Sequence, residues 1–153
     1  LNNRSIENHH LYFKRHPDED YELFYHFHWF LKNENFLIAE HEGRPIAFVL
    51  WYPDFHELIG KGERLGVKAL VKYHLGIKNI QRLKIAEIGV LPEFQGSGVM
   101  AGLFHLCFNL AGTRFAVCES GWIFDSNEQS KNICLRWNPT PAGNYSVFIK
   151  KVS

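Results

Sequence analysis

One ten-residue segment carries three structural signals in a row: the end of a strand, a glycine-rich turn and the start of a helix. Residues 90–99 read V-L-P-E-F-Q-G-S-G-V. Pro92 cannot donate to a strand ladder, so it ends the strand before it. Gly96 and Gly98 let the backbone turn sharply and approach a ligand closely. The apolar residues that follow are spaced as in a core-facing helix: Val99, Leu103, Leu106, Cys107 and Leu110.

The chemistry suited to this segment is phosphate or pyrophosphate binding. The first turn of a helix presents N–H groups without partners and the positive end of the helix dipole, and glycines leave room for an anion there. The same residues would also suit a plain strand-to-helix turn that binds no ligand. Short glycine motifs often occur by chance, so the motif does not distinguish the two interpretations. Both interpretations stay open on the motif alone.

The strand before this turn, residues 82–90, changes the phase of its alternation. Leu83 and Ile85 fall on one face, whereas Ile88 and Val90 fall on the other. One added residue, a β-bulge, produces this slip. A strand buried on both faces would show a similar pattern, so the bulge is the favoured interpretation rather than the sole one.

The remaining elements predict a mixed α/β fold. Pro17 and the three acids after it start a helix that Asn33–Asn35 close, and a hairpin turn is expected at Glu42-Gly43. A loop with a short helix is expected over 54–79. The other expected elements are strands at 36–40, 45–52, 115–118 and 145–149, and a helix at 127–137. The order is α-β-β-α-β-α-β-α-β.

Composition limits the class of protein. The chain has 153 residues, 46% of them hydrophobic, with 17 Lys and Arg against 16 Asp and Glu. One domain over 1–153 is expected, although residues 1–16 show no clear period. A net charge of +1 disfavours a duplex-binding protein, and no apolar run is long enough to span a membrane. We expect no nucleic-acid or membrane partner.

The cysteines and histidines indicate a cytoplasmic protein without a metal. Cys107, Cys118 and Cys134 form no C-x-x-C pair, so we expect reduced, mostly buried thiols. His26 and His28 are two residues apart in the expected helix and cannot chelate together. The four tryptophans are expected in the core or lining a cleft. Because Leu1 is not Met, we expect a fragment of a longer chain, with an upstream domain and a homodimer both open.

Residues 90–99 resemble the signature of the GNAT superfamily of N-acetyltransferases, V-x-P-x-x-(R/Q)-G-x-G-(I/V), and match every defined element of it. The resemblance extends over residues 36–150 and includes an N-x-x-(A/S) helix start at Asn127–Ser130. Three short runs further resemble a poorly characterised branch in which this domain is the C-terminal part of a longer chain: residues 53–54, 89–92 and 120–122.

This resemblance implies a mostly antiparallel central sheet flanked by helices, with a bulged and splayed central strand. It implies acetyl-CoA as co-substrate, with its pyrophosphate on the main-chain N–H groups of Gln95, Gly96, Ser97, Gly98, Val99 and Met100. The Val90 N–H would contact the thioester carbonyl and stabilise its oxyanion. Asn127 would reach the pantetheine arm. A neutral primary amine, of a small molecule or a peptide, would attack directly, without an acetyl-enzyme.

Two positions depart from the family pattern. Met100 stands where the signature has a second Gly or Ala, so the start of the helix is bulkier. Cys134 stands at the family's Tyr, which often protonates the departing thiolate. A thiol is a conceivable acid, but a structural Cys is the commoner case. Tyr145 is a substitute only if the fold brings it close, so the general acid stays open.

Carboxylates within strands are candidates for the base that deprotonates the amine. Glu87 lies in the strand whose end carries the expected acetyl site, and Glu119 ends the neighbouring strand. A buried carboxylate needs a partner, and Lys84 or Arg114 would be a structural one. Asp54 either binds an amine or forms a turn.

Two other functions compete with N-acyl transfer. Gly96-x-Gly98-x-x-Ala101, with Glu119 after it, fits a dinucleotide-binding fingerprint. Five residues including Pro92 separate the strand from the first glycine, which disfavours that reading. A non-catalytic CoA-binding or interaction module with the same fold is the second alternative.

Overall fold

The computed structural model describes residues 1–5, 7, 14–25, 27–76, 79–137, 140–141, 143–144 and 146. The chain divides into two compact units, Leu1–Glu119 and Ser120–Ser153. The expected strand at 145–149 lies almost wholly outside the described residues. In the described part of the chain, no helix combines the length and apolar character needed to cross a membrane.

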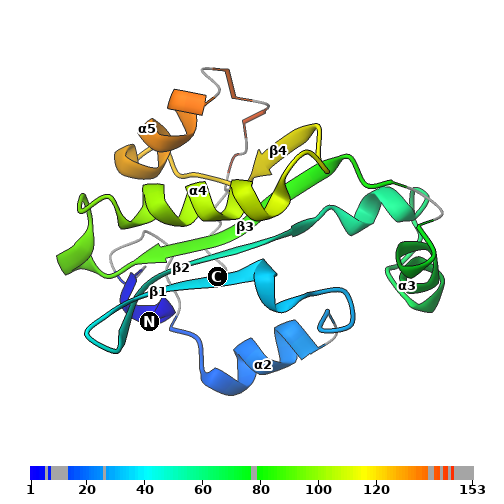
Figure 1. The fold of residues 1–153 in the computed structure, drawn as a ribbon, viewed down its shortest axis with the longest axis horizontal. Helices are drawn as coiled ribbons and strands as arrows, with labels where there is room; N and C mark the ends of the chain where they lie inside the picture. Colours follow the sequence, from blue (N-terminus) through cyan, green and yellow to red (C-terminus); the bar gives the residue numbers. More distant parts are fainter. Residues whose placement is uncertain are drawn as a thin grey trace, which may run out of the picture. The chain divides into compact units, whose positions relative to one another are not determined.

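A four-stranded sheet in the order β1-β2-β3-β4 organises the larger unit (Figure 1). Its strands are β1 (Phe36–His41), β2 (Arg44–Pro53), β3 (Arg82–Val90) and β4 (Val117–Ser120). β1, β2 and β3 pair antiparallel, and β4 runs beside β3 in the same direction. Glu42 and Gly43 have φ of 51° and 73°, as a tight hairpin turn requires. The mixed, mostly antiparallel sheet is confirmed.

The β-bulge expected in β3 is present at Ala86. Leu50 pairs with Glu87, but Trp51 pairs with Ile85, so Ala86 is the extra residue. The bulge changes which side chains face which layer. Before it, Leu83 faces the helix α4, as their shared pocket lining shows. After it, Gly89 faces the opposite layer, where a Cβ at this position would meet Ser5.

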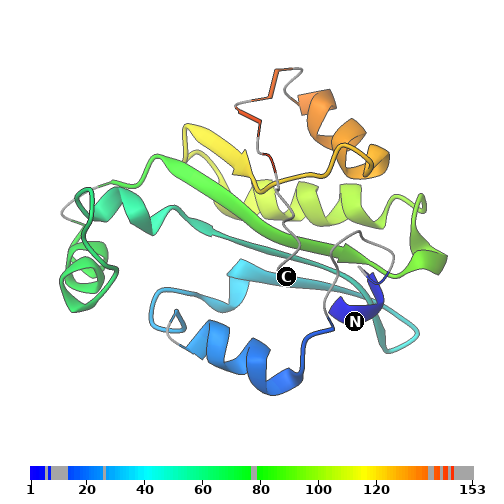
Figure 2. The same ribbon diagram turned by 180° about the vertical axis from the view of Figure 1, so that it is seen from behind.

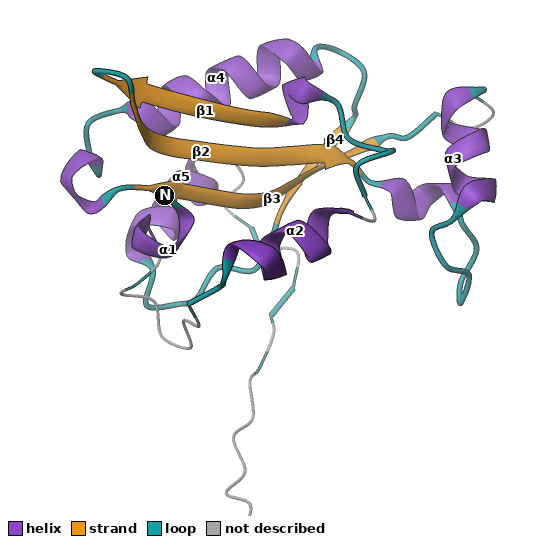
Figure 3. Ribbon diagram, turned by 90° about the horizontal axis from the view of Figure 1, so that it is seen from below, coloured by secondary structure: helices purple, strands orange, loops and turns teal. Residues whose placement is uncertain are grey.

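Helices cover both faces of this sheet. Helix α4 (Val99–Ala111) lies on one side of the strands, and α1 (Asn2–Ser5) and α2 (Pro17–Tyr25) lie on the other (Figure 3). The core contains the central strand β2, which is buried from Ile46 to Trp51. The buried residues of α4 recur at helical spacing: Met100, Leu103, Phe104, Cys107 and Ala111.

The connection from β2 to β3 forms a small folded excursion. It holds the 3-10 helix η2 (Phe55–Leu58) and helix α3 (Val67–His74), which lies beyond one end of the sheet (Figures 1 and 2). Its buried residues form their own cluster together with Phe30: Phe55, Leu58, Ala69 and Ile80. The short helix expected within 54–79 is confirmed.

The second unit contains α5 (Glu128–Trp137), one residue shorter at its start than expected. Asn127 precedes it, and its Oδ1 accepts a hydrogen bond from the Ser130 N–H at 3.1 Å. This is a helix N-cap. Within the same unit, Cys134 Sγ lies 3.7 Å from Ser120 Oγ.

Several expectations about elements and burial are wrong. The helix from Pro17 ends at Tyr25 rather than near residue 33, because the chain leaves the helix to bury Phe30. The fourth strand begins at Val117, two residues later than expected, because Ala116 and Val117 first meet the sheet at Gln81. Leu106 is exposed on α4, where Met100 and Phe104 fill the core instead.

Fewer cysteines and tryptophans are buried than the sequence predicts. Cys107 is buried, Cys134 is half-buried and Cys118 is exposed, all three as free thiols. Trp51 is buried and its Nε1 donates to the Glu34 carbonyl at 2.8 Å. Trp29 and Trp122 are 66% and 81% exposed. Aromatic residues next to strand ends therefore do not all enter the core.

Candidate active site

The glycine-rich segment forms an exposed turn between β3 and α4. After Leu91, a 3-10 helix η3 (Pro92–Phe94) turns the chain, and Gly98 then precedes the first residue of α4. Gly96 and Gly98 have φ of 78° and 86°, in the left-handed region that favours glycine. A Cβ at either position would meet no heavy atom within 4 Å. The space above the turn is therefore open to a ligand.

Most N–H groups of this turn lack an acceptor within the described chain. Gln95 donates to Pro92 O and Ser97 to Phe94 O, each at 3.3 Å, and the first bond of α4 runs from Gly102 N to Gly98 O. Within that part of the chain, the structure records no acceptor for the N–H groups of Gly96, Gly98, Val99 and Met100. Such a set at a helix start is suited to an anion.

Met100 does not narrow this turn. Its side chain is buried in the core beneath α4, as are those of Leu103 and Phe104. The bulk that the sequence places at the start of the helix therefore points away from the open side of the turn.

The main chain of Val90 is directed away from β2. Leu91 N–H donates to Ile46 O at 2.9 Å, which makes these two residues a hydrogen-bonded pair of the ladder. Because such pairs alternate along antiparallel strands, the N–H and C=O of Val90 point to the opposite edge of β3. Gln95 Nε2 reaches the Val90 carbonyl there, at 3.5 Å.

Strand β4 accompanies only the first part of β3. Ala116 N and Val117 N both donate to Gln81 O, and Glu119 contacts Arg82 at 2.6 Å and Lys84 at 3.8 Å. The last residues of β3, including Val90, therefore extend beyond the described part of β4. This is the edge toward which the Val90 N–H points.

Glu87 has an ion-pair partner that the sequence did not suggest. Arg15 Nη2 pairs with Glu87 Oε1, and Arg15 Nε lies 3.1 Å from Asp20 Oδ1 on α2. Arg15 thus joins two carboxylates. Neither Lys84 nor Arg114, the partners expected from the sequence, pairs with Glu87; Lys84 pairs with Asp54 and Glu119, and Arg114 with Glu34.

The other acidic candidates have structural partners. Asp54 is buried, caps η2 by accepting from the His56 N–H, and lies 3.4 Å from Lys84 Nζ. Of the two roles that the sequence allows for Asp54, the structure supports turn formation.

Burial raises the pKa of the neighbouring Tyr52 phenol above its usual value, against an opposing effect of Lys84. Tyr52 therefore stays protonated at neutral pH.

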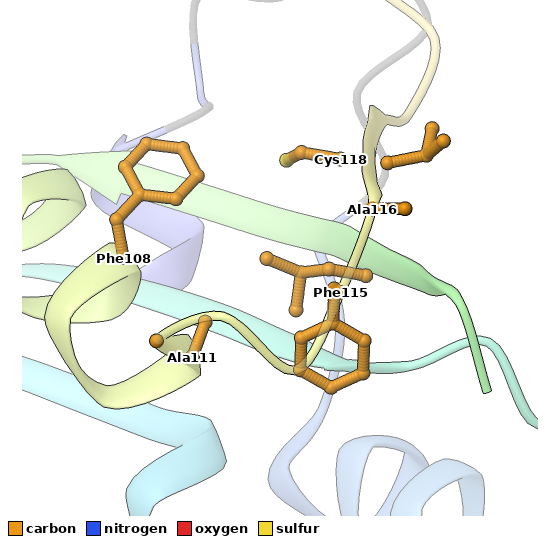
Figure 4. Close-up of a pocket in the computed structure, with 8 residues that line it drawn as sticks. Phe108, Ala111, Phe115, Ala116 and Cys118 are labelled. Atoms are coloured by element: carbon orange, nitrogen blue, oxygen red, sulfur yellow. The ribbon is translucent and has the colours of Figure 1, made fainter. Parts of the chain in front are cut away.

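A small apolar pocket of about 190 Å³ lies at the other end of α4. Phe108, Ala111, Phe115 and Cys118 surround it (Figure 4). It borders the first residues of β3, through Leu83, and not the glycine turn that follows Val90. Among the described residues, no three His, Cys, Asp or Glu side chains gather as a metal site would require.

The site residues fall into three groups. Val90 and the turn from Gln95 to Met100 are continuous in the larger unit, and Glu87 lies three residues before Val90. Asn127 and Cys134 belong to the second unit. Sequence analysis missed Arg15, because its contact with Glu87 spans 72 residues and leaves no local pattern.

The chain matches known proteins in family and in fold. The family model of the acetyltransferase (GNAT) family matches residues 4–136. No curated protein sequence matches the chain.

Solved structures resemble the fold at low identity. AAC(6')-Iy, bound to the bisubstrate analogue CoA-S-monomethyl-acetylneamine, has a TM-score of 0.55 at 16% identity, covering 90% of this chain and 82% of that chain. Apo AAC(6')-IG from Acinetobacter haemolyticus has 0.54 at 18%, covering 90% and 86%. Diaminobutyrate acetyltransferase EctA from Paenibacillus lautus has 0.51 at 18%, covering 82% and 60%.

Proposed function

The chain belongs to the GNAT family of acetyltransferases, and on this premise we propose that it transfers an acetyl group from acetyl-CoA to a primary amine of a small molecule. The observation that carries the proposal is the row of N–H groups at Gly96, Gly98, Val99 and Met100, for which the described part of the chain supplies no acceptor. Solved structures of the same fold hold CoA or a CoA analogue, and two of them are named for amine substrates.

In this proposal the turn holds the pyrophosphate. The N–H groups of Gly96, Gly98, Val99 and Met100 donate directly, because no main-chain acceptor among the described residues competes for them. Gln95 and Ser97 contribute by exchanging their 3.3 Å turn bonds for bonds to the ligand. Asn127, at the start of α5, would contact the pantetheine arm. Bound acetyl-CoA supplies the activated thioester.

The reaction proposed is direct aminolysis of the thioester. The amine nitrogen forms a bond to the carbonyl carbon, the carbon–sulfur bond breaks, and CoA leaves as a thiolate. The Val90 N–H donates to the carbonyl oxygen as negative charge develops on it. Its direction, away from β2, suits this role. The alternative of dinucleotide binding loses support from the antiparallel β1–β2–β3 arrangement, which is not a parallel βαβ unit.

Two proton transfers complete the balance. We assign removal of the amine proton to Glu87, whose carboxylate lies on β3 and is held by Arg15. The departing thiolate takes a proton from water or from Cys134. Because Cys134 is half-buried beside Ser120, a structural role is the simpler one for it.

Calorimetry with acetyl-CoA tests the nucleotide part of the proposal, with NADH in a parallel cell. We expect micromolar binding of acetyl-CoA and no heat with NADH. Absence of acetyl-CoA binding would refute the proposal, and binding of NADH alone would favour the dinucleotide alternative.

Acetylation of a panel of primary amines tests catalysis, and Glu87→Gln tests the base. Glu119→Gln is the matched control, because Glu119 is an acid on the neighbouring strand paired with Arg82. We expect Glu87→Gln to lower kcat by about tenfold or more near neutral pH, and Glu119→Gln to change it less than about threefold. Acetyl-CoA binding without turnover of any amine would instead favour the non-catalytic module.

A further inference from the structure

Helix α3 presents apolar side chains to solvent as well as to the core. Ala69 is buried, and Tyr73 packs against the same core cluster. Three other apolar residues are exposed: Val67 by 77%, Val71 by 46%, and Leu75, the C-cap residue, by 69%. Because they recur at every fourth position, they form one stripe on the side of the helix opposite to Ala69 and Tyr73.

Basic side chains surround this stripe. Lys68 and Lys72 lie on α3 beside it, and Lys61 and Arg64 are exposed in the loop that leads into the helix. Glu63 is the one acid between residues 59 and 76, and its Oε1 lies 3.5 Å from Lys68 Nζ. Lys72 donates to a main-chain carbonyl at 2.9 Å, which leaves its charge uncompensated. A chain of net charge +1 therefore concentrates positive charge around α3.

The apolar stripe and the basic side chains form one surface at the end of the molecule where α3 projects beyond the sheet (Figures 1 and 2). We name it the α3 surface, and it consists of Lys61, Arg64, Val67, Lys68, Val71, Lys72 and Leu75. None of these residues belongs to the turn before α4 or to the strand that carries Glu87 and Val90.

The chemistry of the α3 surface restricts its partner. A nucleic acid would use the positive charges but not the aliphatic stripe. A stable protein interface takes about 20–30 residues on each side, far more than this surface offers. An anionic lipid surface uses both features, because aliphatic side chains enter the boundary between headgroups and acyl chains while Lys and Arg stay beside the phosphates.

We propose that the α3 surface attaches the chain to a membrane surface rich in anionic lipid, with α3 lying in the plane of the headgroups. The sequence expectation of no membrane partner rested on the lack of a spanning run. A surface helix needs no such run, and within the described residues no helix could cross a membrane. The proposal does not depend on acetyl transfer.

Sedimentation with vesicles tests the role of charge. Phosphatidylcholine vesicles with about 30% phosphatidylserine should bind the chain, and vesicles of phosphatidylcholine alone should bind it at least about tenfold more weakly. Lys61→Gln/Arg64→Gln should weaken binding to the anionic vesicles about twentyfold. Lys14→Gln/Arg44→Gln is the matched control, because it removes the same charge from exposed positions outside the α3 surface. Its binding should change less than about threefold.

A second pair of variants tests the apolar stripe. Val71→Ser should weaken binding to the anionic vesicles about fivefold. Ile38→Ser, at a residue of β1 that is 48% exposed, should change binding less than about twofold. Circular dichroism checks that every variant is folded.

Equal weakening by the two charge variants, or by the two apolar variants, would overturn the inference. Binding of a DNA duplex or of an acidic peptide without binding to the anionic vesicles would also overturn it, and would assign the α3 surface to that partner. Vesicle binding with the expected pattern supports the inference even if no amine is acetylated, so its failure and that of the proposed function are distinguishable.

Discussion

Gly89 is a position where one methyl group decides whether β3 can pack. A Cβ there would lie 2.4 Å from Phe48 Cε1 and 2.4 Å from Ser5 Oγ. We expect Gly89→Ala to lower the free energy of unfolding by about 1–3 kcal/mol, because the buried Phe48 ring cannot move aside without disturbing the core. Urea unfolding followed by circular dichroism measures this.

Gly102→Ala is the matched control for that substitution. Gly102 is an exposed residue inside α4, and a Cβ there would meet no heavy atom within 4 Å. Alanine should therefore raise stability by about 0.5–1 kcal/mol through helix propensity. Destabilisation of similar size in both variants would contradict the packing argument for Gly89.

Cys107 gives a defined loss of stability at alkaline pH. Burial, with a smaller effect of Cys118, raises its pKa from 9.0 to about 12. Above pH 9 the unfolded chain ionises this thiol while the folded chain keeps it protonated, so stability falls as pH rises from 9 to 12. The contribution is about 1.4 kcal/mol at pH 10.

Unfolding in urea at pH 7.5 and pH 10 measures this contribution. Wild type should lose about 1.4 kcal/mol more than Cys107→Ala between the two pH values, because the variant lacks the titrating thiol. An equal loss in both proteins would assign the pH dependence to other groups.

At the scale of elements, the turn before α4 needs glycine for two reasons: a positive φ in its backbone and open space for the ligand. Gly98 has φ of 86°, and Gly62, in the loop before α3, has φ of 83° with similarly open space. Alanine should cost about 1–2 kcal/mol of stability at each position. Gly98→Ala should also weaken acetyl-CoA binding about tenfold, because its methyl group would project into the space for the pyrophosphate.

Calorimetry of both variants with acetyl-CoA makes the comparison. Gly62→Ala should bind as wild type, since the loop before α3 is not part of the proposed site. If both variants bind equally well, the turn at Gly98 does not hold the ligand.

Elements whose signals are local were predicted well. β3, its bulge and α4 follow from alternation, Pro92, the glycines and helical spacing, all within about thirty residues. The end of α2 was not predicted, because the apolar spacing continues past Tyr25 to Phe30 although Phe30 packs against Phe55. That contact belongs to a cluster assembled from distant segments, and periodicity cannot report it.

The candidate site likewise contains residues that a local motif predicts and residues that only the fold brings together. The pyrophosphate turn and Val90 could be predicted because a contiguous motif carries them. The partner of Glu87 could not, since Arg15 is 72 residues away and several other basic residues were equally plausible.

For the whole molecule, binding of acetyl-CoA should appear as increased thermal stability. At a ligand concentration one hundred times the dissociation constant, the folded state gains about 2.7 kcal/mol. In a chain of this size that corresponds to a rise in Tm of roughly 5–10 °C. Differential scanning fluorimetry with acetyl-CoA and with NADH measures it, and an equal rise with NADH would contradict the assignment of the turn.

The bulge at Ala86 changes the face of the sheet on which the odd-numbered residues of β3 lie. Before the bulge, the odd-numbered Leu83 faces α4. After it, the odd-numbered Glu87 and Gly89 lie on the opposite face of the sheet, toward Arg15 and Ser5. Deleting Ala86 cannot preserve both halves: either Leu83 leaves the α4 layer, or Glu87 moves away from Arg15. A single exposed alanine, with no chemistry of its own, thus determines on which side of the sheet the carboxylate lies.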